Sequence, residues 1–451
     1  MAFVAKLFGT DGIRGEAYAP PLDRSTVARV GEALAQALPA EEPRILIGRD
    51  TRASGPDIET WLVSGITAAG GLATSAGLVP TPAVAFVTRT EGFDAGVVIS
   101  ASHNPYRDNG IKIFSADGVK SSEALEDAIE QAVQAVASAT SVPQGGTSAV
   151  TPRDFETLYT DHVVSSLGEG VSLAGLKIAL DCANGAGYRI GPKLLASRGV
   201  DVVPLACEPD GKNINRGCGS TAMEPLAAFV PEHGCDLGAA LDGDGDRVLL
   251  VDARGRLVDG DALLLVCARR LKKEGRLNAG GVVATVMSNM ALEVALNQDG
   301  ITLIRTKVGD KFVAQEMAER NIILGGEQSG HIIFSDYAST GDGLLTLMQV
   351  LRVMALENRS LDELAHLEPF PQKLVNVRVG SRPKIDDVPE IRRVIDAAEK
   401  QLDGRGRVLV RYSGTEPLLR IMMEGPDEGE ITSLTEDVRA IVEQSIGSTH
   451  D

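Results

Sequence analysis

One pattern occurs three times along the chain: an apolar run typical of a strand, a helical stretch, and a second apolar run that ends in a polar loop. Alternation of this kind predicts α/β units with largely parallel sheets. The paired runs are residues 44–48 with 95–100, 176–181 with 236–242, and 280–286 with 321–327. Ligands of open α/β sheets gather beyond the carboxyl ends of the strands. Three units of like topology would therefore direct three polar loops toward one cleft.

The length of the chain and the breaks in its pattern predict several domains. At roughly 100–200 residues per domain, 451 residues correspond to three or four. Breaks fall in the linker-like stretch 138–150, near 251–260, and at the two prolines of 368–372. Strand and helix alternate with a different rhythm after the last break, which favours a small α+β domain there. The predicted domains are 1–150, 151–255, 256–369 and 370–451.

The charge balance limits the partners. The chain has 62 acidic and 44 basic residues, a net charge of −18. An acidic surface argues against nucleic acid or an anionic membrane as the main partner, because both require clustered Lys and Arg. A phosphorylated metabolite remains compatible, provided that cations gather locally around it.

The remaining composition favours a cytoplasmic protein. The first residues lack a signal-peptide pattern, and no stretch of about 18 apolar residues predicts a membrane span. The five cysteines form no CxxC pair, which argues against a zinc site or a disulfide framework. Reduced thiols in a cytosol are the simplest interpretation.

The first polar loop, SASHNPYRDNGIK (100–112), offers a candidate nucleophile. Ser102 follows an apolar run and precedes His103, and the later proline and glycine indicate an irregular loop. Its hydroxyl could attack a substrate or carry a phosphate. The alternative is a turn serine that satisfies local backbone groups. No G-x-S-x-G elbow surrounds Ser102, which argues against a hydrolase triad.

The second loop, LDGDGDR (241–247), predicts a metal site. Asp242, Asp244 and Asp246 alternate with glycines, so a tight turn can direct three carboxylates at one point. Such oxygen ligands suit Mg²⁺ or Ca²⁺. An EF-hand is excluded, because its sixth position would be Arg247 and its twelfth Ala253. A solvated acidic turn is the alternative.

Two further loops suit a phosphorylated sugar. In GGEQSGH (325–331), Glu327 and Ser329 can hydrogen-bond sugar hydroxyls; the alternative is a glycine-rich turn with His331 in a local hydrogen bond. RYSGTEPLLR (411–420) combines hydroxyls and backbone N–H groups with cations, which suits a phosphate cradle, although an ordinary turn between strands is the alternative. The cradle residues are Arg411, Ser413, Gly414, Thr415 and Arg420. Loop cations elsewhere are Arg14, Lys112 and Arg247.

Five motifs in one order resemble the α-D-phosphohexomutase superfamily: FGTDGIRG, SASHNP, DGDGDR, GEQSGH and RYSGTEP. The resemblance covers essentially the whole chain. Within the superfamily, FGTDGIRG, NINRGCGST (213–221) and GEQSGH are most similar to the phosphoglucosamine mutase branch.

The resemblance implies a fold and a set of roles. The fold is three similar mixed-sheet α/β domains and a C-terminal TATA-binding-protein-like α+β domain around a central cleft. Ser102 matches the phosphoserine, and Asp242, Asp244 and Asp246 match the ligands of one Mg²⁺, joined by a phosphoryl oxygen on Ser102. Residues matching the catalytic surroundings are Arg14, His103 and Lys112, with Lys112 a general base whose pKa neighbouring cations must lower. Residues matching substrate contacts are Arg247, Glu327, Ser329, His331 and the cradle at 411–420.

The implied reaction converts glucosamine 6-phosphate to glucosamine 1-phosphate through a 1,6-bisphosphate, which would feed UDP-N-acetylglucosamine and cell-wall synthesis. A glucosamine or glucose 1,6-bisphosphate would prime the enzyme. The implied partner is a small phosphosugar, without nucleic acid or membrane, and a homodimer is left open. A phosphoglucomutase or phosphomannomutase is the alternative within the superfamily.

Two other classes compete with a mutase. The first is a dinucleotide-dependent oxidoreductase. NGAGYRIG (184–191) follows an apolar run and approaches the dinucleotide fingerprint, but it reads G-x-G-x-x-x-G, one residue too long. The second is a magnesium-dependent phosphatase, which would release free phosphate steadily from sugar phosphates.

Overall fold

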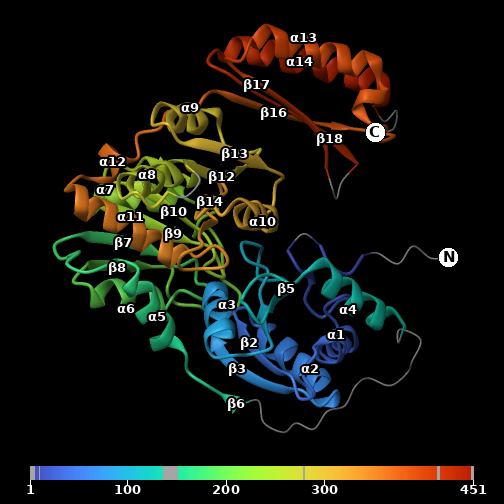
Figure 1. Cartoon of the computed structure of the whole chain (residues 1–451), viewed down its shortest axis with the longest axis vertical. Helices are drawn as coiled ribbons and strands as arrows, with labels where there is room; N and C mark the ends of the chain where they lie inside the picture. The colour runs from blue at the N-terminus through green and yellow to red at the C-terminus, as the bar shows by residue number, and fades with distance from the viewer. Residues whose placement is uncertain (1–5, 10, 136–150, 278–279, 414–416, 448–451) are drawn as a thin grey trace. The chain divides into compact units, whose positions relative to one another are not determined.

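The computed structural model describes residues 6–447 apart from residues 10, 136–150, 278–279 and 414–416. The chain forms two compact units (Figure 1). The first runs to residue 287 and resumes over 300–366; the second comprises residues 288–299 and the chain from 367 onward. Among the described residues, none of the helices has the length and apolar character needed to span a bilayer.

The first unit contains three sheets, and the first of them has six strands. In spatial order they are β1 (Ile13–Glu16), β5 (Asp108–Ser115), β4 (Ala95–Ile99), β2 (Arg44–Arg49), β3 (Leu72–Leu78) and β6 (Thr151–Pro152). Strands β4, β2, β3 and β6 are parallel, and β5 runs antiparallel to both of its neighbours. The accompanying helices are α1 (Arg24–Ala37), α2 (Gly55–Ala68), α3 (Thr81–Thr90) and α4 (Glu123–Ala135).

The second and third sheets also combine parallel strands with an antiparallel strand. The second has the order β11 (Leu257–Val258), β10 (Val248–Asp252), β9 (Leu237–Leu241), β7 (Lys177–Asp181), β8 (Asp201–Leu205). The third has the order β13 (Thr302–Thr306), β12 (Gly281–Thr285), β14 (Leu324–Gly326), β15 (Ile332–Phe334). Their helices in this unit are α5 (Glu156–Ser165), α6 (Ile190–Ser197), α7 (Glu224–Glu232), α8 (Gly260–Lys273), α10 (Asp310–Arg320), α11 (Gly343–Glu357) and α12 (Leu361–Leu364).

The three sheets share a core of three parallel strands, with an antiparallel strand beside the parallel strand that comes last of the three in the sequence. The antiparallel pairs are β4 with β5, β9 with β10, and β14 with β15. The prediction of three similar mixed-sheet α/β domains is therefore confirmed. The loop inside each antiparallel pair begins at the carboxyl end of a parallel strand, where ligands of such sheets bind. These are the three polar loops singled out in the sequence.

Helices α1 and α2 cross closely over the core of the first sheet. A Cβ on Gly31 would lie 2.2 Å from the Leu62 carbonyl oxygen, and one on Gly65 would lie 1.8 Å from that of Ala28. Only glycine permits this approach at the two positions. The helices bury Val27, Leu34, Ile58 and Leu62 against strand residues such as Ile45 and Val97.

The second unit contains an antiparallel sheet with helices on it. Its strands are β16 (Gln372–Arg378), β18 (Leu418–Glu424) and β17 (Arg407–Tyr412), in that order. Helices α13 (Pro389–Leu402) and α14 (Glu428–Ile446) lie side by side along it, and η2 (Ile385–Asp387) precedes α13 (Figure 1). The predicted α+β domain is confirmed. Helix α9 (Met290–Gln298) belongs to the same unit, and Asn289 at its N-cap exchanges two 3.0 Å hydrogen bonds with the Phe370 backbone.

Candidate active site

Ser102 lies in the β4–β5 loop and points into the second domain. Its backbone has φ +52°, in the left-handed region that few residues other than glycine adopt. The side chain is fully buried, and Oγ donates a hydrogen bond to Asp242 Oδ2 at 2.6 Å. Such backbone strain persists only where the surroundings hold it, and it gathers at functional sites.

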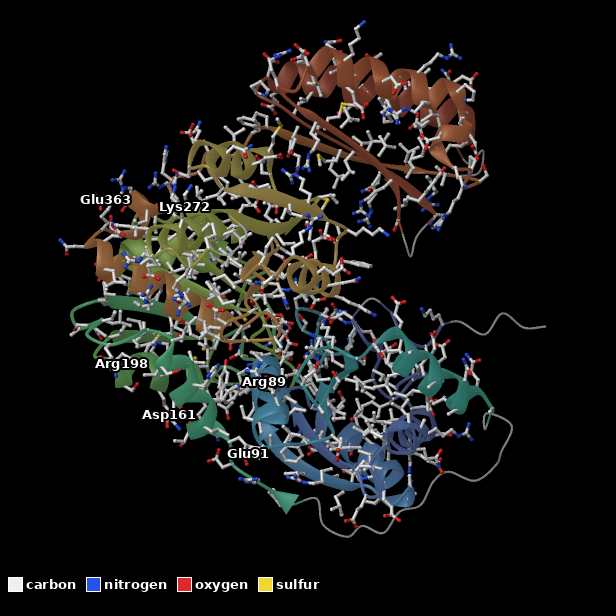
Figure 2. The ribbon with its side chains drawn as sticks, in the orientation of Figure 1. Arg89, Glu91, Asp161, Arg198, Lys272 and Glu363 are labelled. Atoms are coloured by element: carbon white, nitrogen blue, oxygen red, sulfur yellow. The ribbon has the colours of Figure 1, made fainter. Side chains whose placement is uncertain are left out.

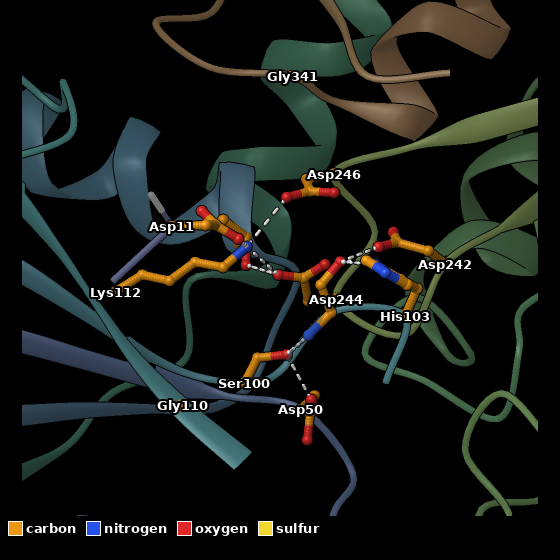
Figure 3. A network of polar contacts seen from close by, with 12 residues as sticks. Asp11, Asp50, Ser100, His103, Gly110, Lys112, Asp242, Asp244, Asp246 and Gly341 are labelled. Atoms are coloured by element: carbon orange, nitrogen blue, oxygen red, sulfur yellow. Dashed lines mark hydrogen bonds and ion pairs between the residues drawn. The ribbon is translucent and has the colours of Figure 1, made fainter. Parts of the chain in front are cut away.

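A buried arginine, Arg52, hydrogen-bonds to the backbone of the Ser102 loop. Arg52 Nη2 donates to the carbonyl oxygens of Ser102 at 3.1 Å and Asn104 at 2.6 Å. Its guanidinium also pairs with Asp50, and Asp50 accepts a 2.5 Å hydrogen bond from Ser100 Oγ (Figure 3). The Ser100 hydroxyl in turn accepts from the Ser102 N–H at 2.9 Å. Buried charges are stable only when paired in this way.

The second domain anchors the same loop. Asn215 Nδ2 donates to the carbonyl oxygens of Ser102 at 2.9 Å and Asn104 at 3.0 Å. Sequence reasoning missed this residue and the Asp50–Arg52 pair. A signal was available, since Asp50 and Arg52 follow β2 directly and therefore lie at the carboxyl edge of the first sheet.

The aspartates of the β9–β10 loop are buried rather than solvated. Asp242, Asp244 and Asp246 are exposed by no more than 3%, so the alternative of a solvated acidic turn is wrong. One carboxylate oxygen from each lies within 4.8 Å of the others, and Figure 3 shows the three grouped together. Oδ1 of Asp244 and Oδ1 of Asp246 have no hydrogen-bond partner among the described residues. Oxygen ligands left without a donor in this way fit a hard divalent cation.

The pKa values of Asp242 and Asp246 are shifted in opposite directions. Burial, followed by repulsion from Asp246 and Asp244, raises the pKa of Asp242 well above its usual range. Burial acts in the same direction on Asp246, but Lys112 and His331 outweigh it and hold the pKa of that carboxyl well below its usual range. The cluster therefore carries negative charge at neutral pH.

Lys112, on β5, faces this cluster. Its ammonium lies 2.9 Å from Asp244 Oδ2, 3.1 Å from Asp246 Oδ2 and 3.3 Å from Asp11 Oδ2. Burial would lower the pKa of Lys112, but the three carboxylates raise it well above its ordinary value. The prediction that neighbouring cations lower this pKa is wrong, because the three carboxylates outweigh the opposing effect of Arg14.

Arg14 and His103 flank the loop from the first domain. Arg14 pairs with Asp11, which also pairs with Lys120. His103 Nδ1 lies 3.4 Å from Ser102 Oγ. Burial, together with the charges of Arg247 and Arg14, lowers the pKa of His103 to about 4, so its imidazole is neutral at pH 7.

Arg247 closes the aspartate loop. Its backbone N–H donates to Asp242 Oδ1 at 3.2 Å, and its Nε lies 3.7 Å from Asp246 Oδ1. Burial opposes the charge on Arg247, but Asp246 and Asp242 raise its pKa further. The guanidinium is thus a fixed cation beside the cluster.

The β14–β15 loop brings His331 to the aspartates. His331 is buried, with Nδ1 3.7 Å from Asp246 Oδ1 and Nε2 3.5 Å from Asp310 Oδ2. Nε2 accepts the Gly341 N–H at 3.0 Å, which places the ring proton on Nδ1, toward Asp246. Glu327 and Ser329 are half-buried in the same loop, and Glu327 Oε1 accepts the Gly309 N–H at 3.1 Å.

The fourth predicted loop lies in the second unit. Gly414 and Thr415 fall outside the described residues. Arg411 on β17 lies directly opposite Arg420 on β18, and burial together with Arg420 lowers the pKa of Arg411. Ser413 is buried, and its N–H donates to the Leu418 carbonyl at 2.8 Å. Two cations on facing strand positions repel each other and favour an anion between or beside them.

The glycine stretch that suggested a dinucleotide site packs against the aspartate loop. Ala186 N–H donates to the Gly243 carbonyl at 2.8 Å, and a Cβ on Gly185 would lie 2.3 Å from that oxygen. These glycines therefore allow β7 and the aspartate loop to approach each other.

Comparisons with known families assign consecutive parts of the chain to one fold. Matches to the phosphoglucomutase/phosphomannomutase family cover alpha/beta/alpha domain I over residues 5–140, domain II over 157–255, domain III over 259–370 and the C-terminal domain over 374–441. The chain belongs to the phosphoglucomutase/phosphomannomutase family.

Relatives of this phosphohexomutase match it over nearly the whole of both chains. A phosphoglucosamine mutase of Syntrophotalea carbinolica is 47% identical, with 98% of each chain covered. A phosphoglucomutase/phosphomannomutase family protein from Burkholderia thailandensis has the same fold, with a TM-score of 0.81, 22% identity and coverage of 98% and 97%. An N-acetylphosphoglucosamine mutase of Aspergillus fumigatus, solved with GlcNAc-6P and magnesium, has a TM-score of 0.70, 18% identity and coverage of 98% and 96%.

Proposed function

We propose that this phosphohexomutase interconverts glucosamine 6-phosphate and glucosamine 1-phosphate, with Ser102 as the phosphate carrier. The main support is the position of the Ser102 hydroxyl. It lies 2.6 Å from Asp242, at the edge of a buried group of three aspartates. Full-length relatives named as phosphoglucosamine mutases, at 44–47% identity, support the amino sugar as substrate.

A divalent cation fits the site. Asp242, Asp244 and Asp246 would hold Mg²⁺ together with an oxygen on Ser102. Bound there, the ion offsets the repulsion among the carboxylates and a phosphoryl group and polarises the phosphorus–oxygen bond that breaks.

The phosphoryl transfer needs no proton from outside the sugar and the serine. As the phosphoryl group passes from Ser102 Oγ to the sugar O1, the O1 proton ends on Ser102 Oγ. The bisphosphate then turns, and O6 returns a phosphoryl group to the serine by the same exchange in reverse. A 1,6-bisphosphate primer loads the serine before the first cycle.

The surrounding cations have electrostatic roles in this proposal. Lys112 keeps its proton among three carboxylates, so we assign it to charge compensation at the transferring phosphoryl group in place of the general-base role. Arg14 and Arg247 assist it, and neutral His103 lies beside the serine oxygen. Proposed sugar contacts are Glu327, Ser329 and His331; the proposed cradle for the second phosphate is Arg411, Ser413, Gly414, Thr415 and Arg420.

Product analysis by ³¹P NMR tests the function. Purified enzyme with Mg²⁺, glucose 1,6-bisphosphate and glucosamine 6-phosphate should form glucosamine 1-phosphate, faster than it converts glucose or mannose 6-phosphate. Ser102→Ala should abolish this product, whereas the exposed control Ser165→Ala should not. Steady release of inorganic phosphate, or turnover by Ser102→Ala, would overturn the proposal.

A further inference from the structure

A cavity of about 430 Å³ lies between the turn after β5 and helix α10. Arg89, in the last turn of α3, lines it. Thr81 begins the same helix and donates a 2.7 Å hydrogen bond to Asp244. At about 1.5 Å per residue, these two positions on α3 are roughly 12 Å apart. The Arg89 end of the cavity is therefore distant from the aspartate cluster. The size of the cavity falls within the usual range of small-molecule sites.

The inner wall of the cavity is apolar. Met317, Ile322 and Ile333 line it, and each is only 2% exposed. Val119 contributes from the first domain. Side chains of this kind favour a ligand with an apolar body.

The charges around the cavity leave an excess cation. Asp117 is engaged in its own turn, where Oδ1 accepts from Ser115 Oγ at 2.5 Å and from the Val119 N–H. Asp310 pairs with Lys120 at 2.5 Å, and Lys311 lies 3.5 Å from Glu123 and 3.8 Å from Glu126. Arg89 is exposed in the last turn of α3 (Figure 2). Among the described residues it forms no ion pair with a carboxylate. An anionic group would find its counter-charge there.

The wall of the cavity is connected to the metal-binding loop. Asp310 Oδ2 lies 3.5 Å from His331 Nε2, and His331 Nδ1 lies 3.7 Å from Asp246 Oδ1. Lys120, the partner of Asp310, also pairs with Asp11, which contacts Lys112 at 3.3 Å. Two short series of charged contacts thus join the cavity to the aspartate cluster.

We propose that this cavity binds a small molecule with an apolar body and one anionic group, and that its occupancy is coupled to cation binding at the aspartate cluster. The ligand would place its anion at Arg89 and its apolar part against Met317 and Ile333. Contact with Lys120 and Asp310 would alter the interactions of His331 and Asp246. Coupling of this kind is reciprocal, so bound cation must alter the affinity of the cavity by the same factor.

The probe for the site is 8-anilinonaphthalene-1-sulfonate, which combines aromatic rings with one sulfonate and fluoresces when buried. Wild-type protein should bind it saturably. Ala318→Trp, which fills the cavity from α10, should abolish the saturable signal, and Arg89→Ala should weaken the affinity about threefold. The matched controls Ala397→Trp on α13 and Arg198→Ala at the end of α6 (labelled in Figure 2) should match wild type.

Circular dichroism verifies that each variant is folded, and the exposed Arg89→Ala provides the test if Ala318→Trp does not fold. A saturable signal that is equal in wild type and in both cavity variants would overturn the site.

The coupling is measured by comparing the dissociation constant of the probe in the presence and in the absence of Mg²⁺. We expect at least a twofold change in wild type and a smaller change in Asp310→Asn, which keeps the shape of the side chain but loses its charge, while the Lys120–Asp11 contact remains. An unchanged constant in wild type would overturn the coupling. Neither measurement uses a sugar phosphate, so these outcomes are independent of the mutase assay.

Discussion

Ser102 Oγ donates to Asp242 Oδ2 at 2.6 Å, although 140 residues separate the two along the chain. The contact joins the β4–β5 loop of one domain to the β9–β10 loop of the next. A phosphoryl group on this oxygen would carry a charge of about −1.5 to −2. Each like-charge pair at ~4 Å costs about 4 kcal/mol at an effective dielectric of ~20. A divalent cation between the two loops would offset this repulsion.

Magnesium should therefore stabilise the protein through the aspartates. We expect added Mg²⁺ to raise the melting temperature of wild type, and EDTA to reverse the effect, because a ligand that binds only the folded state shifts its equilibrium. Asp244→Asn should need a higher Mg²⁺ concentration for the same shift. Thermal melts over a Mg²⁺ titration measure this, with the exposed Asp161→Asn as control. Equal titrations for Asp244→Asn and wild type would contradict a metal role for Asp244.

Lys112 competes with a metal ion for the same carboxylates. Lys112→Met should bind Mg²⁺ more tightly than wild type, because Asp244 and Asp246 lose their internal cation. Turnover should nevertheless fall about 10²–10⁴-fold, since charge compensation at the phosphoryl group is lost. Isothermal calorimetry and the mutase assay measure the two effects. Weaker Mg²⁺ binding together with near-normal turnover would remove Lys112 from the site.

Arg52 should act as a positioning residue for Ser102. Arg52→Met leaves Asp50 buried and unpaired, which should lower the free energy of unfolding by about 3–5 kcal/mol. The double variant Asp50→Asn/Arg52→Met removes both charges and should regain much of that loss. Its kcat should remain low with KM near wild type, because the carbonyl groups of Ser102 and Asn104 have lost the guanidinium donor and keep only Asn215. Urea unfolding and steady-state kinetics separate the two effects; a double variant with wild-type kcat would refute the positioning role.

The sequence predicted the repeated topology because each repeat has the same local pattern of apolar runs and terminal polar loops. It predicted the clustering of the three aspartates for a similar reason, since all three lie in one seven-residue loop. Contacts between loops were harder to find. The pairing of Ser102 with Asp242 came from the family resemblance, and the donation from Asn215 was missed, because spacing along the chain does not encode either.

The charges that surround Lys112 were not predictable from the sequence either. Lys112 was expected among cations, since Arg14 and Arg247 also lie in glycine-containing loops. The β1–β5 pairing and the aspartate loop instead surround its ammonium with Asp11, Asp244 and Asp246. The glycines at 184–191 misled in another way. Their spacing approached a nucleotide motif, whereas the structure uses Gly185 for close packing against Gly243.

Asp342, the N-cap of α11, should make stability depend on pH. Its carboxylate accepts from the Leu345 N–H at 2.9 Å and from the Tyr159 hydroxyl, yet burial raises its pKa from 3.8 to about 6. Between these pKa values the unfolded chain has lost the proton and the folded chain retains it. The stability that this difference contributes is complete below the unfolded pKa and is lost as the pH rises through about 6.

Asp342→Asn keeps the cap acceptor but cannot ionise, so it should lack this pH dependence. From pH 5 to pH 7, wild type should lose about 1 kcal/mol of unfolding free energy relative to the variant. Urea unfolding at the two pH values measures the difference. Asp427→Asn, at the exposed N-cap of α14, is the matched control and should follow wild type. If Asp342→Asn and wild type changed in parallel, Asp342 would already be ionised in the folded protein at pH 5.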